Sequence, residues 1–146
     1  MNVKGEPFVI EYNVRLGDPE TESIVPRIKN DLLEIFLATA NGNLSGIKLE
    51  VDDRVAACVM IVSGGYPGEY SKGKEILGLG NIIRSYVFHA GTTTVNDKTL
   101  TAGGRVLAIT TLADNLKSAV DQSFESALSV NFEGSYFRKD IGKDLM

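Results

Sequence analysis

The chain has 146 residues, of which 43% are hydrophobic and 23% charged, as is typical of one globular domain with a sizeable core. The formal net charge of −4 argues against binding to nucleic acid or to an anionic membrane, and the longest apolar run is too short to span a bilayer. No secretory signal opens the chain and the single cysteine, Cys58, cannot form an internal disulfide, so we expect a protein of the reducing cytoplasm.

The first predicted element is a strand over residues 8–15. Apolar side chains at the even positions from 8 to 14 would share one face, and Glu11, Asn13 and Arg15 would stand in a row on the other. A carboxylate and an amide oxygen suit Mg²⁺, and a guanidinium suits a phosphate or carboxylate. The same alternation also occurs in any antiparallel strand with one solvated face, so the pattern by itself leaves both interpretations open.

Turn and helix signals follow this strand. Gly17 permits a tight turn, Asp18 is a candidate N-cap, and Pro19 suits the first helical position. Pro26 limits this first helix to a short turn or kinks it, and the main helix is expected over residues 26–40, ending at Asn41-Gly42.

From residue 51 onward the pattern predicts strands and then a second helix. The apolar run 55–63 is expected to be central in a sheet, and the Gly- and Pro-rich residues 64–68 form a loop. Residues 86–94 and 99–102 are predicted to form a hairpin, 105–112 a further strand, and Asn115 the cap of the helix; 135–143 are expected to be extended. This order of elements indicates the α+β class.

Four basic residues have two interpretations each. His89 is the only histidine and lies mid-strand without an acid, serine or cysteine pattern, so a structural role is favoured and zinc is not expected. Arg138 and Lys139 suit the phosphate of a ribose phosphate, or form an exposed charge pair neutralised by Asp140. Arg105 presents the same choice.

Five blocks of sequence carry a family resemblance. They are EYNVRLGDPE (residues 11–20), GGYPG (64–68), VFHAGT (87–92), GGRVL (103–107) and RKDIG (138–142). In this order they resemble the glycinamide ribonucleotide synthetases, also called phosphoribosylamine–glycine ligases, which are ATP-grasp enzymes of purine biosynthesis. The likeness runs from about residue 5 to the C-terminus, although Ala102 stands where the family often has a polar side chain.

The resemblance implies roles for individual residues. In the family, ATP phosphorylates glycine to glycyl phosphate, and the amine of 5-phosphoribosylamine then attacks it. Glu11 and Asn13 resemble the ligands of Mg²⁺ or Mn²⁺ that bridge the ATP phosphates. Arg15 resembles the catalytic arginine that neutralises the acceptor carboxylate or the acyl phosphate. The residues that would contact substrate or phosphate are Gly17, Asp18, Arg105, Arg138 and Lys139.

Family members are considerably longer than this chain, so the resemblance implies a C-terminal piece. Residues 1–45 would be the last strand and helix of the ATP-grasp domain. Residues 46–146 would be the terminal domain, mostly antiparallel and similar to a barrel-sandwich hybrid with a packed helix. We expect the chain alone to be inactive and its exposed first strand to favour self-association. A non-catalytic β-rich binding module and the terminal region of another ATP-grasp carboxylate–amine ligase are the alternatives.

Overall fold

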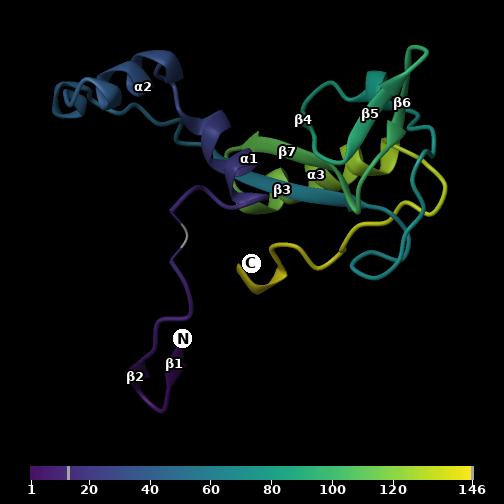
Figure 1. Cartoon of the computed structure of the whole chain (residues 1–146), viewed down its shortest axis with the longest axis horizontal. Coiled ribbons are helices and arrows are strands. Elements are labelled where there is room, and N and C mark those ends of the chain that lie inside the picture. Colours follow the sequence, from purple (N-terminus) through teal and green to yellow (C-terminus); the bar gives the residue numbers. More distant parts are fainter. Residues whose placement is uncertain (13, 146) are drawn as a thin grey trace.

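A computed structural model describes residues 1–12 and 14–145 of the chain. The elements fall into an N-terminal region, residues 1–54, and a β region, residues 55–145 (Figure 1). Among the described residues, the first buried one along the sequence is Ala57. None of the described helices is both long and apolar enough to cross a bilayer. The hydrophobic core therefore belongs to the β region.

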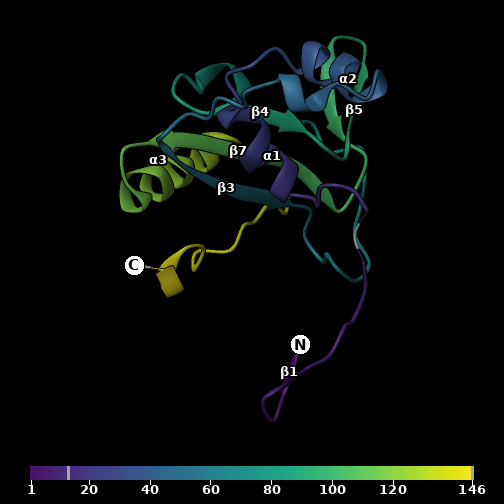
Figure 2. The ribbon, with the colours of Figure 1, turned by 90° about the vertical axis from the view of Figure 1, so that its left-hand side faces the viewer.

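Short elements make up the N-terminal region: β1 (Asn2–Val3), β2 (Glu6–Pro7), α1 (Glu20–Ile24), the 3₁₀ turn Val25–Arg27, α2 (Leu32–Ala40) and the 3₁₀ turn Leu44–Gly46. Strands β1 and β2 form a small hairpin that extends away from the rest of the molecule in both views (Figures 1 and 2). Pro26 does limit the first helix to a short turn, as the sequence predicts.

The main helix begins later than predicted. It starts at Leu32 instead of residue 26, with Asp31 as its N-cap accepting a hydrogen bond from the backbone N–H of Leu33 at 2.7 Å. The residues before it use their backbone groups elsewhere: Ile28 forms an antiparallel bridge with Val51. The stop at Asn41-Gly42 is confirmed, and Gly42 has the positive φ of +67° that suits a helix end.

Three antiparallel strands form the main sheet in the order β3 (Val55–Val62), β7 (Arg105–Ala113), β4 (Tyr86–His89). The prediction that the run 55–63 is central is wrong, because β7 occupies the middle. Strand β3 is nevertheless apolar along its length because both of its faces are covered. Ala57 packs with α3 (Leu116–Ser129), whereas its neighbour Cys58 points to the opposite face, toward Ser23 of α1.

Helix α3 supplies the second layer of the core. Its predicted cap is confirmed, because Asn115 Oδ1 accepts a hydrogen bond from the N–H of Ser118 at 2.9 Å. The principal cluster consists of Val59, Ile61, Ile76, Val106, Leu107, Ile109, Ala127, Val130 and Phe132. A smaller cluster joins Ala57 to Ala119 and Val120. The predicted α+β class is confirmed.

Within the β region, a two-stranded sheet pairs β5 (Thr92–Val95) with β6 (Lys98–Thr101). Asn96 and Asp97 close it with φ values of 48° and 60°, the left-handed pair that a tight hairpin turn needs. The predicted arm 86–94 is divided at Ala90-Gly91, so β4 joins the main sheet and only β5 joins the hairpin. Two further 3₁₀ turns cover Leu79–Asn81 and Lys143–Leu145.

Candidate functional site

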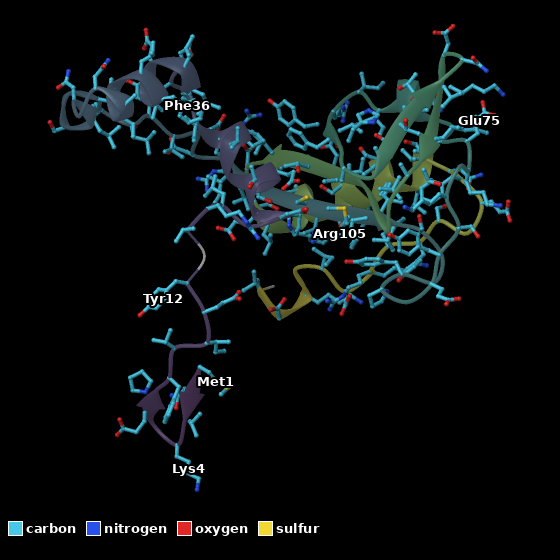
Figure 3. All side chains as sticks on the ribbon, in the orientation of Figure 1. Met1, Lys4, Tyr12, Phe36, Glu75 and Arg105 are labelled. Atoms are coloured by element: carbon cyan, nitrogen blue, oxygen red, sulfur yellow. The ribbon has the colours of Figure 1, made fainter. Side chains whose placement is uncertain are left out.

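The segment that carries Glu11 and Arg15 is not a strand. Residues 8–12 have no regular structure, and their side chains are exposed; Figure 3 shows Tyr12 projecting from a segment without a neighbouring element. A β-strand requires a partner strand for its backbone groups, and the described chain offers none here. Of the three residues predicted to stand in a row, Glu11 is exposed, Arg15 Nη1 donates to Leu16 O at 2.9 Å, and Asn13 lies outside the described residues.

The turn after this segment is well defined. Gly17 O accepts hydrogen bonds from both the N–H and the Oγ1 hydroxyl of Thr21, at 2.9 and 2.7 Å, and these bonds begin α1. Asp18 is not the N-cap that the sequence predicts, since Pro19 takes that position. Asp18 instead contacts Arg105, the first residue of β7: Nη1 donates to the Asp18 main-chain oxygen at 3.0 Å, and Nη2 lies 3.1 Å from Oδ2.

Four of the five sequence blocks meet around Arg105. We call this place the motif corner and define it by residues 17–18, 63–66, 89–92, 103–105 and 136. Ser63 N–H donates to Gly104 O at 2.8 Å, and its hydroxyl donates to Gly103 O at 2.9 Å. Tyr66 covers Gly104 so closely that an added Cβ there would lie 2.1 Å from its ring. The glycines of these blocks thus allow loops distant in the sequence to approach one another.

The VFHAGT block contributes backbone to the corner. Gly91 N–H donates to Arg105 O at 2.8 Å, and Gly91 lies so close to Gly103 that a Cβ on Gly91 would meet its backbone at 2.7 Å. His89 Nδ1 is 3.0 Å from Thr92 Oγ1, within the same block. This local contact is in keeping with the structural role favoured by the sequence.

The RKDIG block follows directly after the corner. Tyr136 pairs with Val62 and its hydroxyl donates to Tyr66 O, so the chain leaves the corner two residues before Arg138. Arg138 forms a bidentate pair with Asp140, with Nε–Oδ1 at 2.9 Å and Nη2–Oδ2 at 2.7 Å. This hydrogen-bonded pair lowers the pKa of Asp140 to about 2 and raises that of Arg138. Lys139 is exposed.

The described residues contain no group of three or more His, Cys, Asp or Glu side chains that could hold a metal ion. A Mg²⁺ ion bound together with nucleotide phosphates needs fewer protein ligands, commonly one or two carboxylates, and the exposed Glu11 has this chemistry. Cys58 is half-buried on β3, and burial raises the pKa of its thiol, which is unfavourable for a nucleophile.

Sequence reasoning missed a polar region on the α3 side of the sheet. Ser85 lies 2.8 Å from the hydroxyl of Thr111 and 2.7 Å from that of Ser126, and Thr111 in turn lies 2.9 Å from Ser123. Two cavities of about 340 and 260 Å³ lie beside this network and share Ile83 and Arg84 in their walls. The signal available in the sequence is the three-residue spacing of Ser123, Ser126 and Ser129, which places these hydroxyls near one face of α3.

Comparison with known proteins identifies the family to which the five sequence blocks belong. Residues 56–144 match the family model described as phosphoribosylglycinamide synthetase, C domain. The chain belongs to this family. It is 48% identical over 141 residues to the phosphoribosylamine–glycine ligase of Caldanaerobacter subterraneus subsp. tengcongensis, covering 97% of this chain and 34% of the relative. It is 41% identical to the human trifunctional purine biosynthetic protein adenosine-3, covering 97% of this chain and 14% of that protein.

The fold comparison agrees with the family. The crystal structure of the phosphoribosylamine–glycine ligase from Thermotoga maritima superposes with a TM-score of 0.76 at 36% identity, covering 97% of this chain and 35% of that one. The chain thus spans about a third of the length of the bacterial ligases that it resembles. The family-model match lies within the β region. The match to the ligases covers 97% of the chain, so it also includes the N-terminal region with Glu11, Arg15 and Asp18.

Proposed function

We propose that this chain forms the C-terminal part of an ATP-dependent ligase that joins glycine to 5-phosphoribosylamine in purine biosynthesis. The glycine carboxylate takes the γ-phosphoryl group of ATP to give glycyl phosphate and ADP. The amine of phosphoribosylamine then displaces phosphate and forms the amide. The observation that carries the proposal is the meeting of the ligase-like blocks at the motif corner, where Arg105 contacts Asp18.

Glu11 and Asn13 are the residues that we assign to the metal. Their carboxylate and amide oxygens are hard ligands of the kind that Mg²⁺ or Mn²⁺ accepts, and such an ion, when bound, offsets the charge of the transferred phosphoryl group. Arg15 is placed four residues after Glu11 and is assigned to the acyl phosphate, whose charge a guanidinium neutralises. Residues 1–45 are then the end of an ATP-grasp domain and residues 46–146 the terminal domain.

Arg138 and Lys139 are assigned to the 5-phosphate of phosphoribosylamine. Both side chains are exposed next to the motif corner. Arg138 is bound to Asp140, so binding a phosphate requires either that this pair opens or that Arg138 donates from its remaining N–H groups while Lys139 supplies the second positive charge.

The exposed apolar surface of the N-terminal region fits a piece of a longer enzyme. Residues 8–16 and α2 expose large apolar side chains that include Phe8, Ile10, Val14, Leu33 and Phe36. Patches of this kind mark interaction surfaces. We infer that the part of the ligase outside this chain covers them, and that the isolated chain self-associates through the exposed N-terminal segment. Sedimentation of the chain at increasing concentration should show dimers or larger species, and removing residues 1–16 should reduce them.

The activity is tested in a hybrid enzyme in which this chain replaces the C-terminal third of the Caldanaerobacter ligase. The hybrid should release ADP only with glycine and phosphoribosylamine present, and the isolated chain should release none. Glu11→Gln should lower kcat at least tenfold, since it removes the metal's carboxylate ligand. The exposed Glu69→Gln serves as its control. An active isolated chain, or a hybrid that prefers a different amine, would contradict the proposal.

The phosphate assignment is tested separately in the same hybrid. Arg138→Ala should mainly raise the KM for phosphoribosylamine, whereas Lys117→Ala on the exposed face of α3 should not change it. An unchanged KM in the Arg138→Ala hybrid would show that this residue does not bind phosphoribosylamine.

A further inference from the structure

The contact between Arg105 and Asp18 joins the N-terminal region to the β region across 87 positions of sequence. Arg105 uses two nitrogens, one on the Asp18 main-chain oxygen at 3.0 Å and one on its carboxylate at 3.1 Å. The two side chains retain 39% and 45% exposure, so screening by solvent keeps their contribution to stability small. If the contact has a role, that role is therefore to position Asp18 relative to β7 and not to stabilise the fold.

Arg105 projects from a fixed base. Its own carbonyl accepts the N–H of Gly91, the preceding Gly104 is covered by Tyr66, and Ser63 binds the carbonyl of Gly104. Figure 3 shows Arg105 among the densely packed side chains of the sheet. A guanidinium that starts from such a base has a restricted range of positions.

Asp18, in contrast to Arg105, lies at the end of an exposed part of the chain. Arg15 lies three residues before it, and the described residues 8–12 further upstream have no regular structure and are exposed. The Gly17–Thr21 hydrogen bonds and the packing of α1 on β3 and β7 hold the chain after Asp18. Asp18 is therefore the point at which the segment containing Glu11 and Arg15 is joined to the rigid part of the molecule.

We propose that Arg105 is a positioning residue, which fixes the direction of the segment 11–15 through its contact with Asp18 and does not itself bind substrate. This inference rests on the proposed function, because it assigns Arg105 an effect on the catalytic roles of Glu11 and Arg15. It replaces the sequence-based expectation that Arg105 and Asp18 each contact substrate or phosphate. The two nitrogens that would bind a phosphate in bidentate fashion are used for Asp18.

The first test measures amide hydrogen exchange in the isolated chain, which does not depend on ligase activity. Arg105→Met retains the aliphatic stem and removes both contacts, so the amides of residues 16–25 should exchange about fivefold faster while those of β3 and β7 do not change. Asp18→Asn should have a smaller effect, because the bond to the main-chain oxygen persists. Lys98→Ala, which removes the exposed pair with Glu75, is the matched control and should leave residues 16–25 unchanged.

The second test uses the hybrid ligase. Arg105→Met should lower kcat on the order of tenfold to hundredfold and leave the KM for phosphoribosylamine within about twofold. Arg105→Lys should recover part of kcat, because one ammonium group can still reach the carboxylate but cannot also hold the main-chain oxygen. Lys98→Ala should be as active as the unaltered hybrid.

Each outcome decides the inference. Unchanged exchange at residues 16–25 in both variants would overturn it, and so would a raised KM with an unchanged kcat, which would assign Arg105 to substrate binding. Faster exchange without any change in kcat would also overturn it. An inactive unaltered hybrid would instead count against the proposed function, and the exchange measurement would then decide alone whether Arg105 holds residues 16–25.

Discussion

The N-terminal region and the β region have similarly apolar sequences but bury them differently. Every described residue before Ala57 keeps at least part of its surface exposed, whereas β7 has an unbroken buried run from residue 106 to 111. Both regions contain amphipathic helices with a side-chain N-cap, Asp31 for α2 and Asn115 for α3. The two helices differ in what they pack against: α3 lies on the main sheet, whereas the main contact of α2 within the described chain is with the 3₁₀ turn Leu44–Gly46. An amphipathic pattern predicts that one face of a helix is apolar, but it does not show whether another element of the same chain covers that face.

The largest expected change in the free energy of unfolding comes from truncating a core leucine, with an exposed leucine as the comparison. Leu107 is 0% exposed in the core and Leu33 is 64% exposed on α2. Leu107→Ala should lower the free energy of unfolding by about 2–5 kcal/mol, because it leaves a cavity. Leu33→Ala should change it by no more than about 0.5 kcal/mol. Urea unfolding followed by circular dichroism measures both. Similar losses for the two variants would mean that α2 belongs to the folded core.

The buried hydroxyl network gives the next effect. Ser123 is fully buried, with its Oγ 3.0 Å from Ala57 O and 2.9 Å from Thr111 Oγ1. Ser123→Ala should cost about 1–3 kcal/mol, since it leaves polar partners unsatisfied in the core. Ser118→Ala, on the exposed side of the same helix, is the control, and thermal unfolding of both proteins is the measurement. Equal melting temperatures would show that water replaces the lost hydroxyl.

Removing each helix cap should change a different measured quantity: the global unfolding free energy for α3 and the local amide exchange for α2. Asn115→Ala should lower the global unfolding free energy by about 1 kcal/mol, because α3 unfolds with the sheet. Asp31→Ala should leave the global midpoint unchanged and accelerate amide exchange within residues 32–40 about fivefold, because α2 opens by itself. Hydrogen exchange by mass spectrometry separates the two cases. A lower global midpoint for Asp31→Ala would show that the two regions unfold together.

The smallest effect is the acid response of the Arg138–Asp140 pair. The pKa of Asp140 is about 2 in the folded chain, below the ordinary aspartate value of about 3.9. A depressed carboxyl pKa contributes stability above the unfolded-state value and loses it as the pH falls from about 4 to about 2. An NMR titration of the Asp140 carboxyl carbon should give this low midpoint, and Arg138→Gln should return it toward 3.9. Titration at the ordinary value in the unaltered chain would mean that Arg138 is not held by Asp140.

Predictions from the sequence are more accurate for the β region than for the N-terminal region. In the β region, local signals sufficed: the apolar run of β3, the hairpin of β5 and β6, and the Asn115 cap are all present. The central position was assigned to β3 instead of β7, because helices on both faces make an edge strand as apolar as a central one.

The errors in the N-terminal region have a single cause. Alternation over residues 8–15 specifies a strand only if neighbouring strands supply hydrogen-bond partners, and the described chain contains none for them. The sequence pattern predicts a start of α2 that is too early, because the bridge between Ile28 and Val51 is a long-range pairing without a local signal. The Arg105–Asp18 contact is also a pairing between residues far apart in the sequence, so the pattern identifies both residues as candidates but does not predict that they meet.

The tyrosines of the motif corner have a practical consequence for spectroscopy. The chain contains no tryptophan and five tyrosines, and three of them, Tyr66, Tyr70 and Tyr136, are gathered where Tyr66 covers Gly104. Three of the five tyrosine rings that emit in the ultraviolet therefore lie close to Gly104, the residue before Arg105. Binding events or substitutions at this place can be followed optically without attaching a label.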